Sequence, residues 1–90
     1  MMLNRYLVSL LNQMASEGHV TRKSQKVYIS ILGFYLAIKW LKERNFVECD
    51  GVDEKNYKIW RLTKKGMELV KLLKRIEELI RYDKSAPVQQ

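Results

Sequence analysis

A chain of ninety residues forms one small domain, and its 17 Lys and Arg against 10 Asp and Glu give it a net charge of +7. The single cysteine, Cys49, has no partner for an intrachain disulfide, and the single histidine, His19, is too few for a histidine metal site or a catalytic triad. The most apolar run, residues 27–38, is shorter than the ~20 residues of a membrane-spanning helix. Because the N-terminus also lacks the pattern of a signal peptide, we expect a cytoplasmic protein with no membrane segment. From the missing histidine and cysteine sites we also expect no enzymatic activity, metal or cofactor.

Two long helices and a short one are predicted in the first half of the chain. Residues 2–17 carry apolar side chains at helical spacing. Thr21 is a candidate N-cap for a short basic helix at about residues 22–28. Ser30 is a second candidate N-cap, and the helix that it opens runs to Asn45, a residue that tolerates the end of a helix.

A β-hairpin and a last helix are predicted in the second half. Residues 46–62 contain two segments of alternating apolar character around a polar, turn-forming loop. Thr63 then caps a helix at about residues 64–82, and residues 85–90 are expected to form a disordered tail. The expected organisation is a single domain over residues 1–84, mainly α with a small β-hairpin (α+β).

The order of these elements is that of a winged helix-turn-helix domain, in which a β-hairpin wing follows the recognition helix. The segments LKERNFVE and YKIWRLTKKG, on either side of the wing loop, resemble the winged-helix regulators of the MarR and PadR type, and especially the small winged-helix proteins of archaea and archaeal viruses. The resemblance covers about residues 19–82 and is most specific at RLTKKG. It implies binding of double-stranded DNA by a homodimer whose N- and C-terminal helices form the subunit interface, without enzymatic activity.

Positive charge gathers on and before the recognition helix. Residues 19–45 carry six basic residues and one acidic residue, a distribution that favours a nucleic acid as partner. In helix-turn-helix proteins the first helix of the pair crosses the DNA backbone, so Arg22, Lys23 and Lys26 are predicted phosphate contacts. The alternative is a solvated basic face with no ligand.

The recognition helix has one side for the core and an unusual outer side. At 100° per residue, the side predicted to face the core holds Ser30, Ile31, Phe34, Ala37, Ile38, Leu41 and Asn45. The outer side and its flank begin with Leu32, Tyr35 and Leu36, where the related regulators usually have small polar residues. Three interpretations of these residues stay open: contact with thymine methyls and sugars of DNA, a protein interface, or cover by the first helix or a partner subunit.

The predicted DNA contacts extend from the basic segment to the wing. They comprise Arg22, Lys23, Lys26, Ser30, Leu32, Gly33, Tyr35, Lys39, Lys55, Asn56 and Lys58. Gly33 costs about 1 kcal/mol against Ala inside a helix, which close approach to a phosphate or tolerance near the helix start would explain. In the wing, Asp50, Asp53 and Glu54 oppose phosphate binding, so we expect only a weak contribution from it.

The last helix carries an apolar seam wide enough to bury against the domain and a second subunit together. The predicted dimer interface comprises Leu3, Leu7, Leu10, Leu69, Leu72, Leu73, Ile76, Leu79 and Ile80. The expected function is that of a sequence-specific, double-stranded DNA-binding transcriptional regulator acting as a homodimer. Two alternatives remain: a winged-helix protein–protein interaction module, and a chromatin-like protein that binds DNA with little sequence preference.

Overall fold

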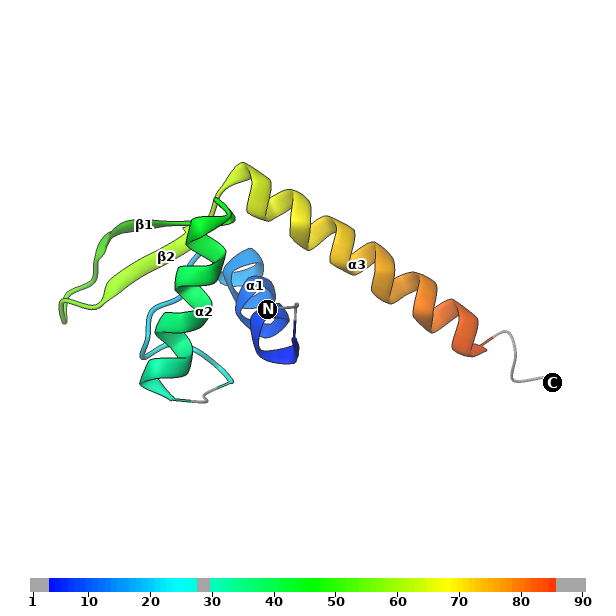
Figure 1. The fold of residues 1–90 in the computed structure, drawn as a ribbon, viewed down its shortest axis with the longest axis horizontal. Coiled ribbons are helices and arrows are strands. Elements are labelled where there is room, and N and C mark those ends of the chain that lie inside the picture. Colours follow the sequence, from blue (N-terminus) through cyan, green and yellow to red (C-terminus); the bar gives the residue numbers. More distant parts are fainter. Residues whose placement is uncertain (1–3, 28–29, 86–90) are drawn as a thin grey trace.

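The computed structural model describes residues 4–27 and 30–85, with side chains up to residue 81. Its elements are α1 (Arg5–Glu17), α2 (Ile31–Glu43), β1 (Val47–Val52), β2 (Lys58–Leu62) and α3 (Lys64–Ser85). In Figure 1, α1 and α2 lie beside the hairpin, and α3 starts against the domain and then projects away from it. The prediction of a mainly helical domain with one antiparallel hairpin is confirmed. The predicted tail begins at residue 85, but Ser85 is the last residue of α3; residues 86–90 lie outside the described residues, as does Leu3.

Side-chain caps fix where the first two helices begin. The Asn4 carboxamide oxygen accepts from the Leu7 N–H, so α1 starts at Arg5. Ser30 Oγ accepts from the Gly33 N–H at 2.9 Å, which confirms the predicted N-cap of α2. Satisfying one of the otherwise unpaired N–H groups in this way is worth about 1 kcal/mol at each helix start.

Asn45 turns the chain at the end of α2. Its φ of +62° lies in the left-handed region, which Asn tolerates better than most residues. In this conformation the Asn45 N–H donates to the Lys42 carbonyl and the Phe46 N–H donates to the Leu41 carbonyl. The last carbonyls of the helix are thereby satisfied and the chain is aimed into β1, as predicted for this residue.

The prediction of a short helix at residues 22–28 is wrong over residues 22–27, the part of it that the structure describes. Residues 22–27 form a turn and an irregular loop instead, and the next two residues lie outside the described part of the chain. In a helix the Lys26 N–H would donate to the Arg22 carbonyl, but each group bonds to a glutamine side chain: the N–H to Gln13 and the carbonyl to Gln25. Side chains thus supply the partners that a helix would otherwise provide.

The wing is longer than the alternation of the sequence indicates. β1 and β2 pair antiparallel, with Cys49 opposite Trp60, and one extra residue in β1 makes a bulge at Gly51, whose φ is +84°. Val20, which the sequence places only in a connection, exchanges two backbone hydrogen bonds with Trp60, of 2.8 and 2.9 Å. This bridge ties the segment after α1 to the wing strand.

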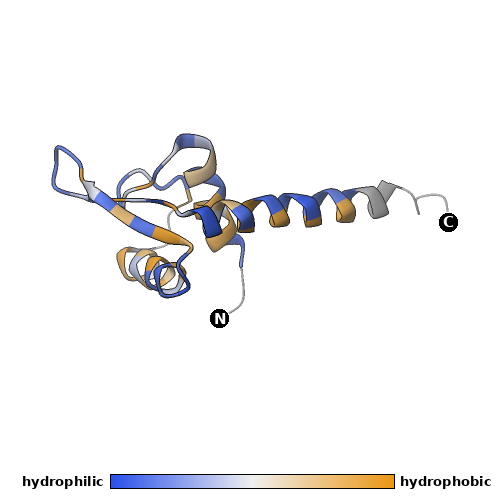
Figure 2. Ribbon diagram, turned by 90° about the horizontal axis from the view of Figure 1, so that it is seen from above, coloured by the Kyte–Doolittle hydropathy of each residue, from blue (hydrophilic) through white to orange (hydrophobic). Residues whose placement is uncertain are grey.

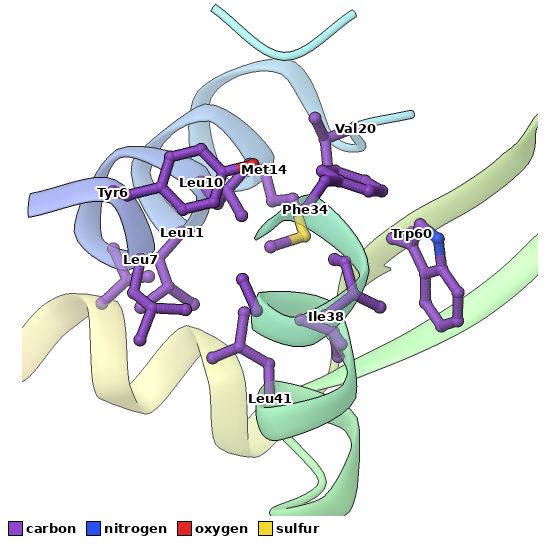
Figure 3. Close-up of a cluster of buried hydrophobic side chains, with 13 residues drawn as sticks. Tyr6, Leu7, Leu10, Leu11, Met14, Val20, Phe34, Ile38, Leu41 and Trp60 are labelled. Atoms are coloured by element: carbon purple, nitrogen blue, oxygen red, sulfur yellow. The ribbon is translucent and has the colours of Figure 1, made fainter. Parts of the chain in front are cut away.

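The core forms between α1, α2, the start of α3 and the inner face of β2 (Figure 3). Its largest fully buried side chains are Leu7, Leu10, Leu11, Met14, Val20, Phe34 and Leu41. The predicted core side of α2 is confirmed for Phe34, Ala37, Ile38 and Leu41, whereas Ile31 and Asn45, at the two ends of the helix, are exposed. Leu7 and Leu10 were predicted at a subunit interface, and this is wrong, because they are buried in the core of the protomer. Leu69 and Leu73 of α3, predicted at the subunit interface, are partly buried against this core.

The start of α3 locks onto the turn that follows α2. Thr63 Oγ1 accepts from the Gly66 N–H and donates to the Asn45 carbonyl, while the Thr63 N–H donates to the Phe46 carbonyl. A Cβ atom on Gly66 would lie 2.1 Å from the Phe46 carbonyl oxygen, so no other residue fits without a backbone shift. This close contact gives a structural reason for the RLTKKG junction.

Candidate nucleic-acid interface

The outer side of α2 is an uncovered apolar surface. Leu32 is 68% exposed and Leu36 51%, and Tyr35 and Ile31 are each almost half exposed. α1 packs on the opposite side of α2, around Phe34, so the interpretation that the first helix covers the outer side is wrong. Tyr35 leans edge-on against Phe34, with ring centroids 5.7 Å apart, and this contact holds the Tyr35 ring at the border of core and surface.

The start of α2 is occupied by its own cap. The Ser30 hydroxyl accepts from the Gly33 N–H, so this N–H is engaged in the cap and Ser30 has only its O–H to donate to a phosphate. One turn beyond Leu36, Lys39 is exposed and makes no hydrogen bond or ion pair with any described residue. Of the residues predicted to contact DNA from α2, Leu32, Tyr35 and Lys39 are exposed.

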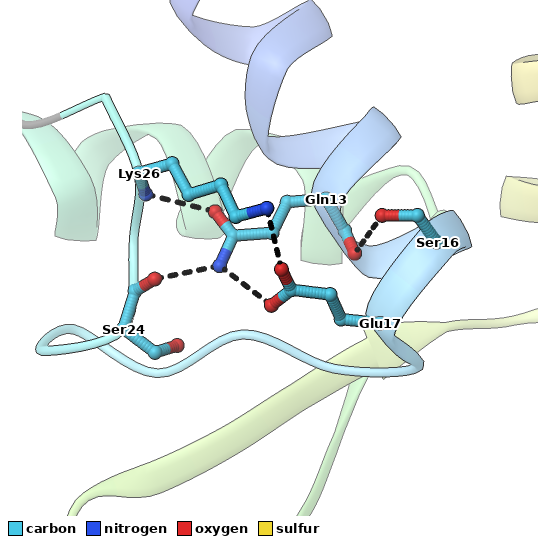
Figure 4. Close-up of polar contacts among 5 residues, drawn as sticks. All are labelled: Gln13, Ser16, Glu17, Ser24 and Lys26. Carbon is cyan, nitrogen blue, oxygen red and sulfur yellow. Dashed lines mark hydrogen bonds and ion pairs between the residues drawn. The ribbon is translucent and has the colours of Figure 1, made fainter.

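Gln13 anchors the basic segment that precedes α2 (Figure 4). Its side-chain amide donates to the Ser24 carbonyl at 2.6 Å, and its carbonyl oxygen accepts from the Lys26 N–H at 2.9 Å. Gln13 is buried, and so is Gln25, which accepts from the Tyr6 hydroxyl. Two buried amides therefore hold this loop against α1 although it has no regular secondary structure.

The three basic residues of this segment have different surroundings. The Lys26 ammonium lies 2.7 Å from a Glu17 carboxylate oxygen and, by hydrogen bonding, holds the pKa of that carboxyl below its ordinary value. The pair therefore persists at neutral pH and is lost only as the pH falls through that lowered pKa. Arg22 lies over the Tyr57 ring at 4.9 Å, with a buried Nε that has no hydrogen-bond partner among the described residues.

Only Lys23 of the three is an exposed, unpaired cation within the described part of the chain. It lines a cleft between this loop and the wing tip, together with Thr21, Ser24, Asp53, Glu54, Lys55 and Tyr57. The Arg22–Tyr57 contact joins the loop to the wing. The predicted role of Arg22 as a phosphate contact is less well supported than that of Lys23.

The wing tip is a rigid turn with exposed polar residues. The Asp53 carboxylate accepts from the N–H groups of Lys55 and Tyr57, both at 2.9 Å, and Asn56 adopts a φ of +68°. Lys55, Asn56 and Lys58 are all exposed. The Asp53 charge that was expected to oppose phosphate binding is thus engaged within the turn.

Acidic residues on the outer face of the wing form ion pairs with an arginine. Arg61 lies 3.2 Å from Glu48 and 3.5 Å from Asp50, on the side of β2 opposite Trp60. Because these groups are exposed, the pairs add little stability. They do reduce the negative field of the wing near the basic loop.

The sequence reasoning missed Gln13, Gln25 and Tyr6, whose contacts shape the loop. One signal was present: Gln13 lies seven residues after Tyr6, two helical turns along α1, and so shares the apolar side of that helix. A polar residue on a core-facing stripe must find a buried partner, and here the partner is the loop backbone.

A metal site needs several ligating side chains close together, and a membrane span needs a long apolar helix. Over residues 4–27 and 30–81, no group of three or more His, Cys, Asp or Glu side chains is placed to hold a metal ion. No helix in the described parts is long and apolar enough to cross a lipid bilayer.

Three solved structures have the same fold as this chain. No protein-family profile and no curated protein sequence matches the chain. AF1382 from Archaeoglobus fulgidus superposes with a TM-score of 0.70 at 24% identity, over 88% of this chain and 91% of that one. A PadR family transcription regulator from Clostridium difficile gives 0.70 at 15% identity, over 92% and 98%. A transcriptional regulator from Clostridium thermocellum gives 0.66 at 14%, over 94% and 97%.

These similarities span nearly the whole of each chain, at sequence identities that show a common fold. The winged-helix fold expected from the resemblance is confirmed, with the β1–β2 hairpin directly following α2.

Proposed function

We propose that this chain is a DNA-binding transcriptional regulator that acts as a homodimer, with α2 in the major groove. The observation that carries the proposal is the outer side of α2, which is uncovered and continues into the exposed Lys39 on a winged-helix fold. The two clostridial structures with this fold are named as transcription regulators, which supports the same function. In such motifs the second helix of the pair enters the major groove.

The proposed phosphate contacts are the cations that have no acidic partner. Lys23 in the loop and Lys55 and Lys58 in the wing are exposed, and none forms an ion pair with a described residue. Each phosphate that a lysine neutralises releases a counterion, so the affinity should fall steeply as salt rises. Lys26 contributes less, because Glu17 already compensates its charge.

The proposed dimer forms through α3, and the apolar seam of that helix supports it. Leu72 is 62% exposed, and Ile76, Leu79 and Ile80 are each about half exposed along one side of the helix (Figure 2). An exposed apolar stripe of this length on a projecting helix favours pairing with another helix. A two-fold dimer would place two copies of α2 one DNA turn apart, or a multiple of it, so the target should be a pseudo-palindrome.

Binding to labelled duplexes over a series of salt concentrations tests the DNA-binding part of this function. We expect measurable binding at physiological salt and a linear fall of log affinity with log salt. Lys74→Ala is the control for the loss of one exposed lysine and should leave binding unchanged, because Lys74 lies on α3, on the side opposite the apolar seam. Absence of binding to every duplex at physiological salt would contradict the proposal.

The second candidate function is a protein–protein interaction module that uses the apolar side of α2. The exposure of Leu32 and Leu36 favours it, because such patches often mark protein interfaces. A chromatin-like role predicts strong salt dependence with no preference among duplexes, whereas a regulator prefers its own site by a large ratio.

A further inference from the structure

The outer side of α2 is apolar throughout its first two turns. Leu32, Tyr35 and Leu36 follow one another at helical spacing and are each about half exposed or more, and Ile31 borders them. We call these four residues the apolar patch. Lys39 continues the same side of the helix one turn further on. The patch is therefore the surface that α2 would present to the floor of a groove.

The patch lacks the side chains that read most bases. Guanine is commonly read by Arg or Lys, adenine by Asn or Gln, and cytosine by Asp or Glu, whereas the thymine methyl is read by apolar contact. The only hydrogen-bonding group in the patch is the Tyr35 hydroxyl. The Ser30 hydroxyl just before the patch is engaged in the helix cap. Beyond the patch, the same side of α2 offers only Lys39 and, at the end of the helix, Glu43 for hydrogen bonds to a base.

The charges around the patch suit DNA better than a protein partner. Lys39 extends the patch with an exposed cation that makes no ion pair with any described residue, and residues 19–45 together carry six basic residues and one acidic residue. Lysine is depleted in the cores of protein interfaces. In the major groove, by contrast, the methyl groups lie on a floor between two rows of phosphates, which matches an apolar strip next to cations.

We infer that α2 recognises its site chiefly through thymine methyl groups, with Leu32 and Leu36 packed on the C5 methyls of an A·T-rich half-site. This inference rests on the proposed DNA-binding function and names what the recognition helix selects. Leu32 is the most exposed residue of the patch and lies in the first turn of α2, the part of a recognition helix that reaches deepest into the groove. Each methyl that is buried against these leucines removes apolar surface from water.

Replacing thymine by uracil in the DNA tests the inference with the unaltered protein. A duplex that the full chain selects from a random library is remade with uracil at each half-site thymine in turn, which removes a methyl and leaves base pairing intact. We expect about a fourfold loss of affinity for each contacted methyl, the value for one buried methylene-sized group. Uracil at thymines outside the footprint serves as the control and should have no effect.

Variants of the patch connect the effect to α2. In Leu32→Ala and Leu36→Ala the affinity ratio between the thymine and uracil duplexes should shrink towards one. Met67→Ala, which alters a similarly exposed apolar residue of α3, should keep the full ratio. Because all three side chains are exposed, these variants should fold, and circular dichroism checks this directly.

The outcomes separate the inference from the function on which it rests. Selected sites without thymine, or affinity that does not change with uracil, would overturn the inference and leave DNA binding standing. If no duplex is bound, the proposed function fails together with the inference. If in addition Leu32→Ala and Leu36→Ala abolish self-association in sedimentation experiments, the patch is a protein interface.

Discussion

Gln13 determines the course of the chain between the first two helices. Its amide holds the Ser24 carbonyl and its oxygen holds the Lys26 N–H, and both bonds are at least partly shielded from water. Backbone groups that lose such partners while buried cost about 1–3 kcal/mol. One side chain in α1 therefore places the basic loop that precedes α2.

Gln13→Ala should lower the free energy of unfolding by about 1–3 kcal/mol, because two backbone groups lose their partners. Urea denaturation followed by circular dichroism measures the change. Asn12→Ala, at the neighbouring half-buried position, forms no side-chain hydrogen bond with a described residue and should change stability by less than about 0.5 kcal/mol. Equal effects of the two substitutions would show that the amide is not the anchor.

Gly66→Ala tests the close contact at the start of α3. Alanine is about 1 kcal/mol more favourable than glycine within a helix, so the substitution would stabilise the protein if the contact were absent. Because the new Cβ would lie 2.1 Å from the Phe46 carbonyl oxygen, we expect a net loss of about 2 kcal/mol or more. Thermal unfolding measures it, with the exposed Glu68→Ala as control. An unchanged or raised melting temperature would disprove the contact.

At the scale of the elements, much of the fold could be predicted from local sequence signals. Ser30 and Thr63 are caps, Asn45 is a helix end, and the alternation around the 53–57 turn is that of a hairpin, because each signal acts within a few residues. The loop after α1 could not be predicted in this way. Its shape depends on Gln13, which is distant in sequence from the groups that it binds.

The candidate site was predictable in composition but less so in detail. The cluster of positive charge and the apolar outer side of α2 follow from residue type and helical spacing. Which of Arg22, Lys23 and Lys26 is unpaired could not be predicted. Arg22 contacts Tyr57 and Lys26 pairs with Glu17, and these partners approach only in the folded chain. The assignment of Leu7 and Leu10 to a dimer failed because an apolar stripe does not reveal which surface covers it.

Arg22→Ala and Lys23→Ala remove the same charge from adjacent positions of the loop and should act differently. Lys23→Ala should weaken all duplexes alike and reduce the slope of log affinity against log salt by about 0.9, the value for one phosphate contact. Arg22→Ala should leave that slope nearly unchanged, because the guanidinium lies against Tyr57. Its effect should be a more mobile wing, seen as faster amide exchange at residues 53–57. A larger change of slope for Arg22→Ala would reverse these assignments.

At the scale of the whole molecule, α3 is the element that the domain core does not explain. Of its described side chains only Val70 is a buried hydrophobic residue, and the second half of the helix leaves the body of the domain (Figure 1). The first turns of α3 pack on the core through Leu69, Val70 and Leu73, whereas Leu72, Ile76, Leu79 and Ile80 are exposed. An exposed apolar stripe of this kind favours a partner. A second copy of α3 would cover the stripe, as the proposed dimer requires.

Ile76→Glu should convert the proposed dimer into a monomer, because it places a charge in the centre of the apolar seam. Analytical ultracentrifugation at matched concentrations distinguishes the two states. Lys74→Glu changes the charge on the opposite side of the same helix and should remain dimeric. A monomeric unaltered protein, or a dimer that survives Ile76→Glu, would rule out this interface.

The central claim is that α2 reads duplex DNA, and the affinity ratio between a selected and a random duplex tests it most directly. Fluorescence anisotropy at one fixed, physiological salt concentration gives this ratio for the unaltered protein and for Tyr35→Ala. We predict a ratio of about 10³ or more for the unaltered protein and a clearly smaller one for Tyr35→Ala, since specificity resides in α2. A ratio near one for the unaltered protein, or one that Tyr35→Ala leaves intact, would contradict the account.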